Sequence, residues 1–207
     1  MRRLSAVLLA AALLACCSRP AAALEDGTFV LGLSGFLGQG DFVSADGSYL
    51  SAYDHGELGV QLQSWYMLGD EYAFALSAGA GRAREQNEAA GKPNRYYQQS
   101  SWNVRVGGDR MMDIARNALL YFGPGIEYWR GDATFTNILG AGKVTTPEVT
   151  RWSVSGRFGA MLVLSESLSL TGQMGYRMGT ASASEGGSKT SWYTSGFDGA
   201  AGLAFAF

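Results

Sequence analysis

The chain has 207 residues, with 16 Lys or Arg against 18 Asp or Glu and a formal net charge of −2. This acidic excess argues against a nucleic-acid partner, because neutralising phosphates takes clustered Lys and Arg. After the first 23 residues, no segment approaches the 18 or so apolar residues of a transmembrane helix. A membrane role would therefore require a β-barrel.

The N-terminus has the order of a secretory signal peptide. Arg2 and Arg3 are followed by an apolar run over residues 6–17 and then by small residues up to Ala23, the charged, apolar and small segments of an export signal. We predict a signal peptide over residues 1–23 and one mature domain over 24–207, with a lipoprotein acylation site at Cys16 as the second interpretation. Cutting after Ala23 removes both cysteines and leaves 13 basic residues against 18 acidic, so the mature domain has no thiol for a disulfide or a metal.

The mature chain contains eight runs in which apolar residues alternate with small or polar ones. In one of them Tyr72, Phe74 and Leu76 alternate with Ser77 and Gly79, the period-2 pattern of a β-strand. A proline cannot donate to the strand ladder, so Pro124 predicts a bulge within residues 123–125. The predicted strands are 28–38, 56–68, 72–82, 98–112, 118–130, 150–164, 168–178 and 192–207.

The connections alternate between short and long. Short turns are expected at 69–70, 113–117 and 165–167, and long polar loops at 39–55, 83–97, 131–149 and 179–191. An up-and-down membrane barrel has short periplasmic turns and long external loops, and an even number of strands puts both termini on the periplasmic side. We therefore predict an all-β fold, an eight-stranded antiparallel up-and-down transmembrane β-barrel.

The composition of the two strand faces supports a membrane barrel. The non-apolar face is mainly Gly, Ser and Gln with few charges, which suits the narrow interior of eight strands. Aromatic residues fall near predicted strand ends, where girdles at the membrane interfaces are expected. They are Phe29, Tyr66, Tyr72, Tyr128, Trp152, Tyr176, Tyr193 and Phe207.

The last strand ends on an aromatic residue. Its closing run, from Gly202 through Phe205 to Phe207, resembles the C-terminal signal by which bacterial outer-membrane barrels are recognised by their assembly machinery. The leader, the eight strands, the loop pattern and this terminus together resemble the small outer-membrane barrels of the OmpA-like, OmpX-like and opacity-protein group. The resemblance implies a Gram-negative outer membrane, contact with outer-membrane lipid and lipopolysaccharide, and surface roles such as adhesion, envelope integrity or small-solute passage.

The search for catalytic chemistry yields no candidate site, cofactor or metal. Lipid A deacylases of the outer membrane resemble this architecture but need a His near a Ser, whereas the single histidine, His55, falls in the predicted first external loop without such a motif. Nucleophile-elbow, zinc-protease and phosphate-loop motifs are missing as well. We therefore expect a non-enzymatic protein.

The six inward charges of the predicted strands are the clearest candidate constellation. Unpaired charges in a tight interior are costly, so we expect these residues to pair with one another, among them Arg157 with Glu127. A separate tripeptide, Arg130-Gly131-Asp132, matches an integrin-binding motif and opens the predicted third external loop. The interior charges are Glu57, Arg105, Glu127, Arg157, Arg177 and Asp198.

The sequence leaves two classes of function open. The first class is a structural or surface-interaction barrel. Its lumen is filled by the charges, and its loops bind a host or cell-surface ligand. A small-solute channel is the alternative, and a lipid A-modifying enzyme is a distant third.

Overall fold

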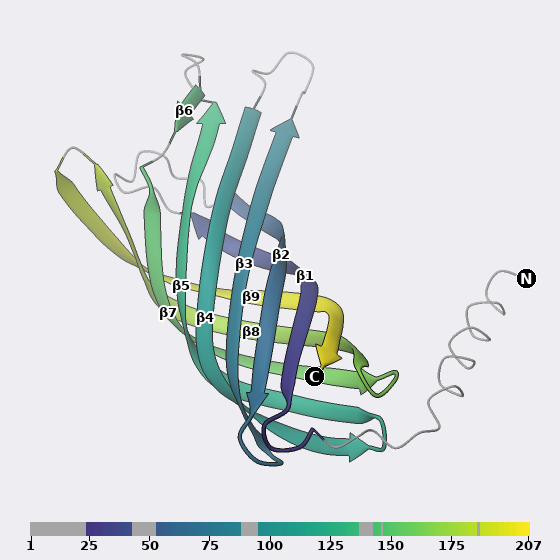
Figure 1. The fold of residues 1–207 in the computed structure, drawn as a ribbon. Coiled ribbons are helices and arrows are strands. Elements are labelled where there is room, and N and C mark those ends of the chain that lie inside the picture. Colours follow the sequence, from purple (N-terminus) through teal and green to yellow (C-terminus); the bar gives the residue numbers. More distant parts are fainter. Residues whose placement is uncertain (1–23, 43–52, 88–94, 137–142, 146, 186) are drawn as a thin grey trace, which may run out of the picture.

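The computed structural model describes residues 24–42, 53–87, 95–136, 143–145, 147–185 and 187–207, and Figure 1 shows their arrangement. The predicted signal peptide and the Cys16 site lie outside these residues and stay predictions. The described strands are β1 (Phe29–Phe42), β2 (Tyr53–Met67), β3 (Tyr72–Asn87), β4 (Arg95–Ala115), β5 (Ala118–Thr136), β6 (Lys143–Thr145), β7 (Val149–Val163), β8 (Leu168–Glu185) and β9 (Ser188–Ala206).

Eight of these strands form one closed antiparallel ring. Each long strand pairs with the next along the chain, and β9 returns to pair with β1, from Val30 opposite Ala206 to Gly38 opposite Asp198. The three-residue β6 pairs only with the outer end of β5 and stands outside the ring. The predicted eight-stranded barrel is confirmed. Among the described residues, no helix is long and apolar enough to cross a membrane.

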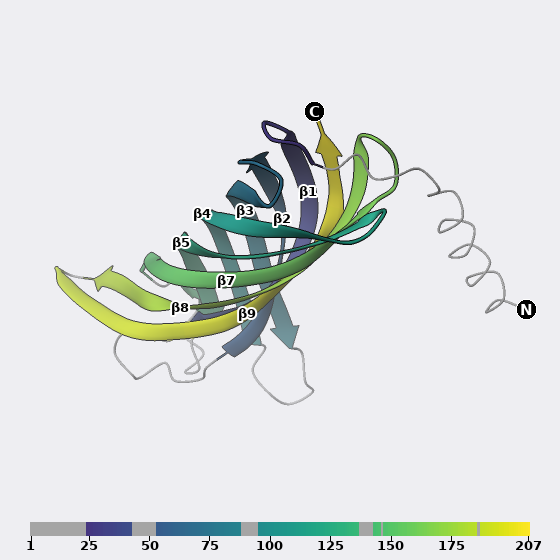
Figure 2. The same cartoon turned by 90° about the horizontal axis from the view of Figure 1, so that it is seen from below.

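The two ends of the barrel differ in their connections. The short connections, at residues 68–71, 116–117 and 164–167, lie at the end where the described chain begins and where it finishes. Phe29 and Phe207 exchange backbone hydrogen bonds there, at 3.3 and 2.9 Å. This end is the periplasmic end if the barrel follows the usual orientation of its class, and Figure 2 shows it from below.

The strands extend further at the opposite, outer end than the alternation predicts. β1 runs to Phe42, β3 to Asn87 and β5 to Thr136, each several residues past its expected end. No lipid imposes an apolar outer side on these extensions, as the exposed outward Arg84 of β3 and Asp132 of β5 show, and the period-2 signal is therefore lost. His55 and the Arg130-Gly131-Asp132 tripeptide consequently lie within β2 and β5 rather than in loops. The remaining predicted loop segments, 43–52, 88–94 and 137–142, lie outside the described residues.

Two local predictions are wrong. The predicted loop at 179–191 is mostly strand, because β8 and β9 stay paired as far as Glu185 opposite Ser188, and Gly187 turns the chain with a φ of 85°. This angle is one that glycine adopts without steric cost. No bulge occurs at Pro124, which stays in register with Gly156 of β7. The ladder to β4 omits two pairs there and resumes in the same register, and its one irregularity lies between Asp113 and Ala115.

Large apolar side chains cover the outside of the ring. Leu58, Val60, Val154 and Met174 are all more than 60% exposed, which a water-facing surface would not tolerate but a lipid-facing one requires. At the outer edge of this band, ring centroids of Trp102 and Tyr128 are 5.3 Å apart, and those of Tyr128 and Trp152 are 4.9 Å apart. These contacts form part of the expected girdle, to which Tyr176 and Phe197 add a pair at 4.7 Å.

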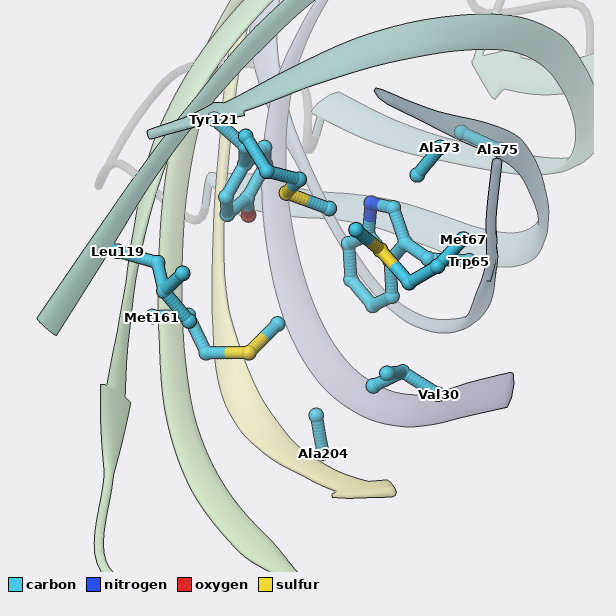
Figure 3. Close-up of a cluster of buried hydrophobic side chains, with 10 residues drawn as sticks. Val30, Trp65, Met67, Ala73, Ala75, Leu119, Tyr121, Met161 and Ala204 are labelled. Carbon is cyan, nitrogen blue, oxygen red and sulfur yellow. The ribbon is translucent and has the colours of Figure 1, made fainter. Parts of the chain in front are cut away.

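The lumen is filled by side chains, as eight strands require. Toward the short-turn end, Trp65 and Tyr121 pack edge to face at 5.6 Å in a buried apolar cluster that includes Met67, Met111 and Met161 (Figure 3). A smaller buried cluster, centred on Trp129, occupies the outer end on β5, β7 and β8. Charged side chains lie between the two clusters.

A closed ring of this kind should resist SDS. We expect the refolded protein to run on an SDS gel at a different position before and after boiling, because the closed ladder leaves no open edge in the membrane segment from which unfolding can start. Identical mobility of the heated and unheated samples would contradict the closed pairing of β1 with β9.

Candidate functional site: the charged lumen

Among the residues whose side chains the structure describes, eight Asp, Glu and Arg side chains point into the lumen, and their formal charges balance. Seven of these residues are at most 6% exposed, and the Asp198 side chain is 25% exposed. Removing a charge from water costs several kcal/mol unless a partner compensates it. The eight are Glu57, Asp109, Glu127 and Asp198 with Arg105, Arg151, Arg157 and Arg177.

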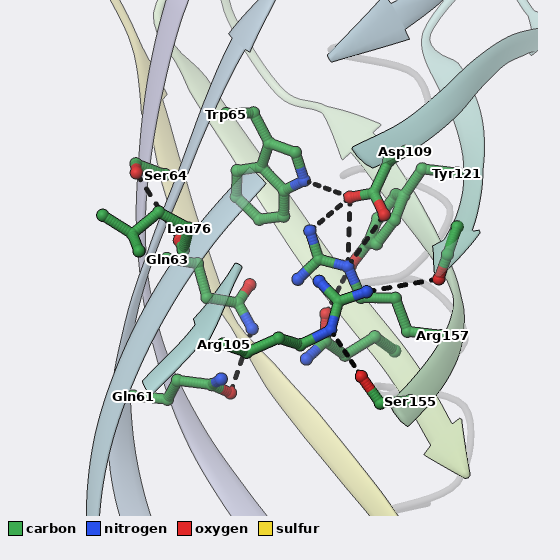
Figure 4. A network of polar contacts seen from close by, with 12 residues as sticks. Gln61, Gln63, Ser64, Trp65, Leu76, Arg105, Asp109, Tyr121, Ser155 and Arg157 are labelled. Carbon is green, nitrogen blue, oxygen red and sulfur yellow. Dashed lines mark hydrogen bonds and ion pairs between the residues drawn. The ribbon is translucent and has the colours of Figure 1, made fainter. Parts of the chain in front are cut away.

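The Asp109 carboxylate is the centre of the lower part of this set. Arg157 donates from Nε to both carboxylate oxygens, at 3.1 and 3.0 Å, and from Nη2 to Oδ2. The indole Nε1 of Trp65 donates to Oδ2 at 2.9 Å. Figure 4 shows these contacts converging on Asp109 from strands on opposite sides of the lumen. The carboxylate is thus surrounded by donors, as a fully buried anion requires.

Arg157 is also held by aromatic rings. Its guanidinium carbon lies 5.3 Å from the centroid of the Trp65 ring and 5.6 Å from that of Tyr121. Both distances are within the range of a cation–π interaction. The Arg157–Asp109 ion pair therefore packs directly against the apolar cluster that contains Trp65 and Tyr121.

Arg105 occupies the next level and is held by neutral acceptors. Its Nε donates to Ser155 Oγ at 3.0 Å and its Nη2 to the Gly123 carbonyl at 3.2 Å. A Cβ atom on Gly125 would lie 2.6 Å from the Arg105 guanidinium, and one on Gly123 would lie 2.7 Å from Asp109 Oδ1. The two glycines on either side of Pro124 thus leave the space that the Arg105 and Asp109 side chains occupy.

The upper part of the set contains two more ion pairs. Arg151 Nη2 lies 2.9 Å from Glu127 Oε1, and Arg177 Nη1 lies 3.2 Å from Asp198 Oδ2. The guanidinium of Arg151 also lies 5.0 Å from the centroid of the Trp129 ring. Glu57 accepts a short hydrogen bond from the Ser101 hydroxyl.

A small cavity separates the lower and upper parts. Its volume is about 30 Å³, and three acids and three arginines line it: Glu57, Glu127, Asp198, Arg105, Arg157 and Arg177. Arg105 Nη1, Arg157 Nη1 and Asn103 Oδ1 are buried there without a hydrogen-bond partner among the described atoms. A space of this size accommodates one or two water molecules, which would satisfy these polar atoms, but it is too small for a solute.

The structure places all six predicted interior charges in or beside the lumen, but not with the expected partners. Arg157 pairs with Asp109 and Glu127 pairs with Arg151, so the predicted Arg157–Glu127 pair does not form. Asp109 and Arg151 were missed, although strand alternation marks both as inward: Asp109 lies four residues from Arg105, and Arg151 lies six from Arg157.

The predicted assembly-signal residues lie along the end of β9. Phe205 and Phe207 point outward at the short-turn end and are 44% and 77% exposed. Gly202 faces the β1 backbone closely, since an added Cβ would lie 2.1 Å from the Leu33 carbonyl oxygen. Their role in assembly remains a prediction.

The integrin-like tripeptide is held in the sheet. Gly131 pairs with Ser101 of β4 and with Val149 of β7, while Arg130 forms an exposed ion pair with Glu148. The tripeptide is therefore extended, with Arg130 and Gly131 paired on both sides and Asp132 paired with β4, and it is not presented at a loop tip. Among the described residues, no group of three or more His, Cys, Asp or Glu is placed to hold a metal ion.

The fold and the charged lumen define a small outer-membrane barrel. The model of the outer membrane protein beta-barrel domain family matches residues 8–177, and the chain belongs to that family. No curated protein matches the chain in sequence.

Solved structures show the same fold at low sequence identity. OprG from Pseudomonas aeruginosa has a TM-score of 0.60 at 15% identity, over 88% of this chain and 97% of that one. Neisserial surface protein A has a TM-score of 0.52 at 12% identity, over 88% and 98%. Ail, the attachment invasion locus protein of Yersinia pestis, has a TM-score of 0.50 at 14% identity, over 88% and 99%.

The Arg157–Asp109 pair should show energetic coupling. We expect Arg157→Ala and Asp109→Ala each to lower the unfolding free energy by about 3–5 kcal/mol, because each leaves an uncompensated buried charge, and the double variant to lose less than the sum. Urea unfolding in lipid vesicles, followed by tryptophan fluorescence, measures the three values. Arg157→Ala combined with Glu127→Ala is the matched control, which should be closer to additive because those residues belong to different ion pairs. Additive losses for Arg157 and Asp109 would contradict the pairing.

Deleting Phe207 tests the assembly prediction. We expect the shortened protein to accumulate in the periplasm, because the deletion removes the terminal aromatic side chain and the last backbone bonds to Phe29. Fractionation of cell envelopes measures the distribution, and Phe205→Leu, which keeps the chain length, separates the loss of an aromatic ring from the loss of the terminus. Normal membrane insertion of the deletion variant would show that Phe207 is not part of the assembly signal.

Proposed function

We propose that the protein is a non-enzymatic barrel of the Gram-negative outer membrane with a closed lumen, acting as a structural or surface-interaction protein. The observation that carries the proposal is the filled interior. A cavity of about 30 Å³ is bounded by buried charged side chains, and the Trp65–Tyr121 cluster packs below it.

The outer end supports a surface role. From the level of Trp152, which pairs with Thr180, β8 continues for five more residues to Glu185 and stays paired with β9. At about 3.3 Å per residue, this hairpin extends roughly 16 Å along the strand direction past the aromatic girdle. Its polar residues, among them Ser184, Lys189 and Ser191, are exposed on a paired hairpin, where an external partner could contact them.

A small-solute channel is the second candidate, and the cavity is the observation that favours it. Arg157 lines the cavity, and its side chain reaches from β7 past the intervening β5 to Asp109 of β4. A conformational change that moved this side chain would join the cavity to the space near the apolar cluster. Replacing Arg157 therefore helps to distinguish a closed barrel from a small-solute channel experimentally.

Planar-bilayer conductance tests the closed lumen. We expect the refolded parent protein to show no stable current steps, and Arg157→Ala to leak ions because it removes a long buried side chain that fills the lumen beside the cavity. Lys189→Ala, on the exposed hairpin, is the control that changes charge without touching the interior and should remain silent. Stable conductance of the parent would overturn the closed-lumen proposal in favour of the channel.

A further inference from the structure

The four arginines of the lumen differ in what compensates their charge. Arg157, Arg151 and Arg177 each form an ion pair with a carboxylate. Arg105 is only 6% exposed, but it donates to a serine hydroxyl and a backbone carbonyl, and among the described residues no carboxylate pairs with it. A neutral acceptor leaves the charge of a cation in place, so a buried arginine held in this way is costly.

Glu57 completes the balance of formal charges in the lumen but is not the partner of Arg105. Its carboxylate accepts a hydrogen bond from Ser101, which lies four residues from Arg105 on β4, roughly 13 Å along the strand. The charges that act on Glu57 include those of Arg177 and Arg151, but not that of Arg105. The overall balance therefore conceals a local excess of positive charge, because the lower part of the lumen has two arginines for one carboxylate.

The two arginines of the lower part, Arg105 and Arg157, repel each other. Both line the small cavity, and Figure 4 shows their guanidinium groups close together. Apart from the loss of water on burial, the strongest electrostatic influence on Arg105 is repulsion by Arg157, which exceeds the attraction of any single carboxylate. An anion that contacted both guanidinium groups would offset this repulsion with two attractions.

Each of the two guanidinium groups also has one nitrogen that can donate into the cavity. The Nη1 atoms of Arg105 and Arg157 are buried and have no hydrogen-bond partner among the described atoms. The remaining nitrogens are engaged, since Arg157 donates from Nε and Nη2 to Asp109, and Arg105 donates from Nε to Ser155 and from Nη2 to Gly123. These contacts fix the positions of both Nη1 groups. Guanidinium groups make their strongest hydrogen bonds to anions.

We propose that the cavity binds a single halide-sized anion, such as chloride, between Arg105 and Arg157. A halide ion is close to a water molecule in size, so a cavity of about 30 Å³ accepts it. Sulfate, phosphate and carboxylates have several heavy atoms and do not fit. A water molecule could accept the same hydrogen bonds, but it would leave the excess positive charge uncompensated.

The anion enters as the barrel folds, because side chains fill the lumen around the cavity. It then acts as a structural part of the interior, supplying the negative charge that no side chain brings to Arg105. This site rests on the closed lumen of the proposed function.

Urea unfolding of the refolded barrel in lipid vesicles tests the site. Chloride replaces sulfate stepwise at constant ionic strength, and bromide serves as a second halide. An anion that binds only the folded state raises the folding equilibrium constant in proportion to its concentration above the dissociation constant. We therefore expect about a ten-fold rise in that constant for each ten-fold rise in halide. Arg105→Gln should lose this dependence, and because it shares the general effects of the salts on stability, its difference from the parent isolates the site.

Arg151→Gln is the matched control. It removes the same charge from the lumen, but Arg151 does not line the cavity. This variant should keep the halide dependence, although the loss of the partner of Glu127 lowers its stability. Crystals of the parent protein grown in bromide should show the anomalous signal of one bromide ion between Arg105 and Arg157. That signal decides the proposal even if Arg105→Gln fails to fold, which the heat shift on an SDS gel would reveal.

Three results would overturn the anion site. One is a parent protein whose unfolding does not depend on halide, and another is an equal dependence in the parent and in Arg105→Gln. The third is bromide in the crystal without any effect of halide on unfolding, which would be an adventitious ion only. Stable conductance of the parent in a planar bilayer would instead contradict the closed lumen. A halide dependence that Arg105→Gln still abolished would then support the anion site by itself, so the two failures are distinguishable.

Discussion

The burial of the Asp109 carboxylate constrains much of the lumen. An anion with no access to water needs several donors, and Arg157 and Trp65 supply them from β7 and β2. Arg157 in turn needs a place between the Trp65 and Tyr121 rings. Tyr121 fits only because Gly159, on the adjacent strand, has no side chain, since a Cβ there would lie 2.3 Å from the phenol ring. One buried charge on β4 thus specifies residues on β2, β5 and β7.

The membrane segment could be predicted from the sequence because lipid imposes a strict rule on it. Alternation identified every ring strand and the inward direction of Arg105 and Arg157, and the short-turn ends were placed within three residues. Past the aromatic girdle no lipid imposes an apolar outer face, so alternation no longer marks a strand. The paired extension of β8 to Glu185 was therefore predicted to be a loop. Pro124 predicted a bulge, but the ladder accommodates it by omitting two pairs to β4.

Which charged residues pair inside the lumen depends on more than which side chains point inward. Asp109 and Arg157 lie on β4 and β7, which are separated by β5, so their relative height depends on two successive registers. A shift of one residue in either register would reverse an entire strand face. Alternation alone could show that both residues face inward, but not that they meet, and the sequence therefore predicted Glu127 as the partner of Arg157.

The pairing of β9 with β1 also sets the order in which the barrel can form. Val30 and Ala206 are partners at nearly opposite ends of the chain, so this contact has about the largest sequence separation that the protein offers. Long-range pairings form slowly, and unpaired strand edges promote aggregation in the meantime. β1 is synthesised first and must keep one edge unpaired until the last residues arrive. The chain therefore depends on protection of that edge throughout its transit to the membrane, and a truncated product cannot close.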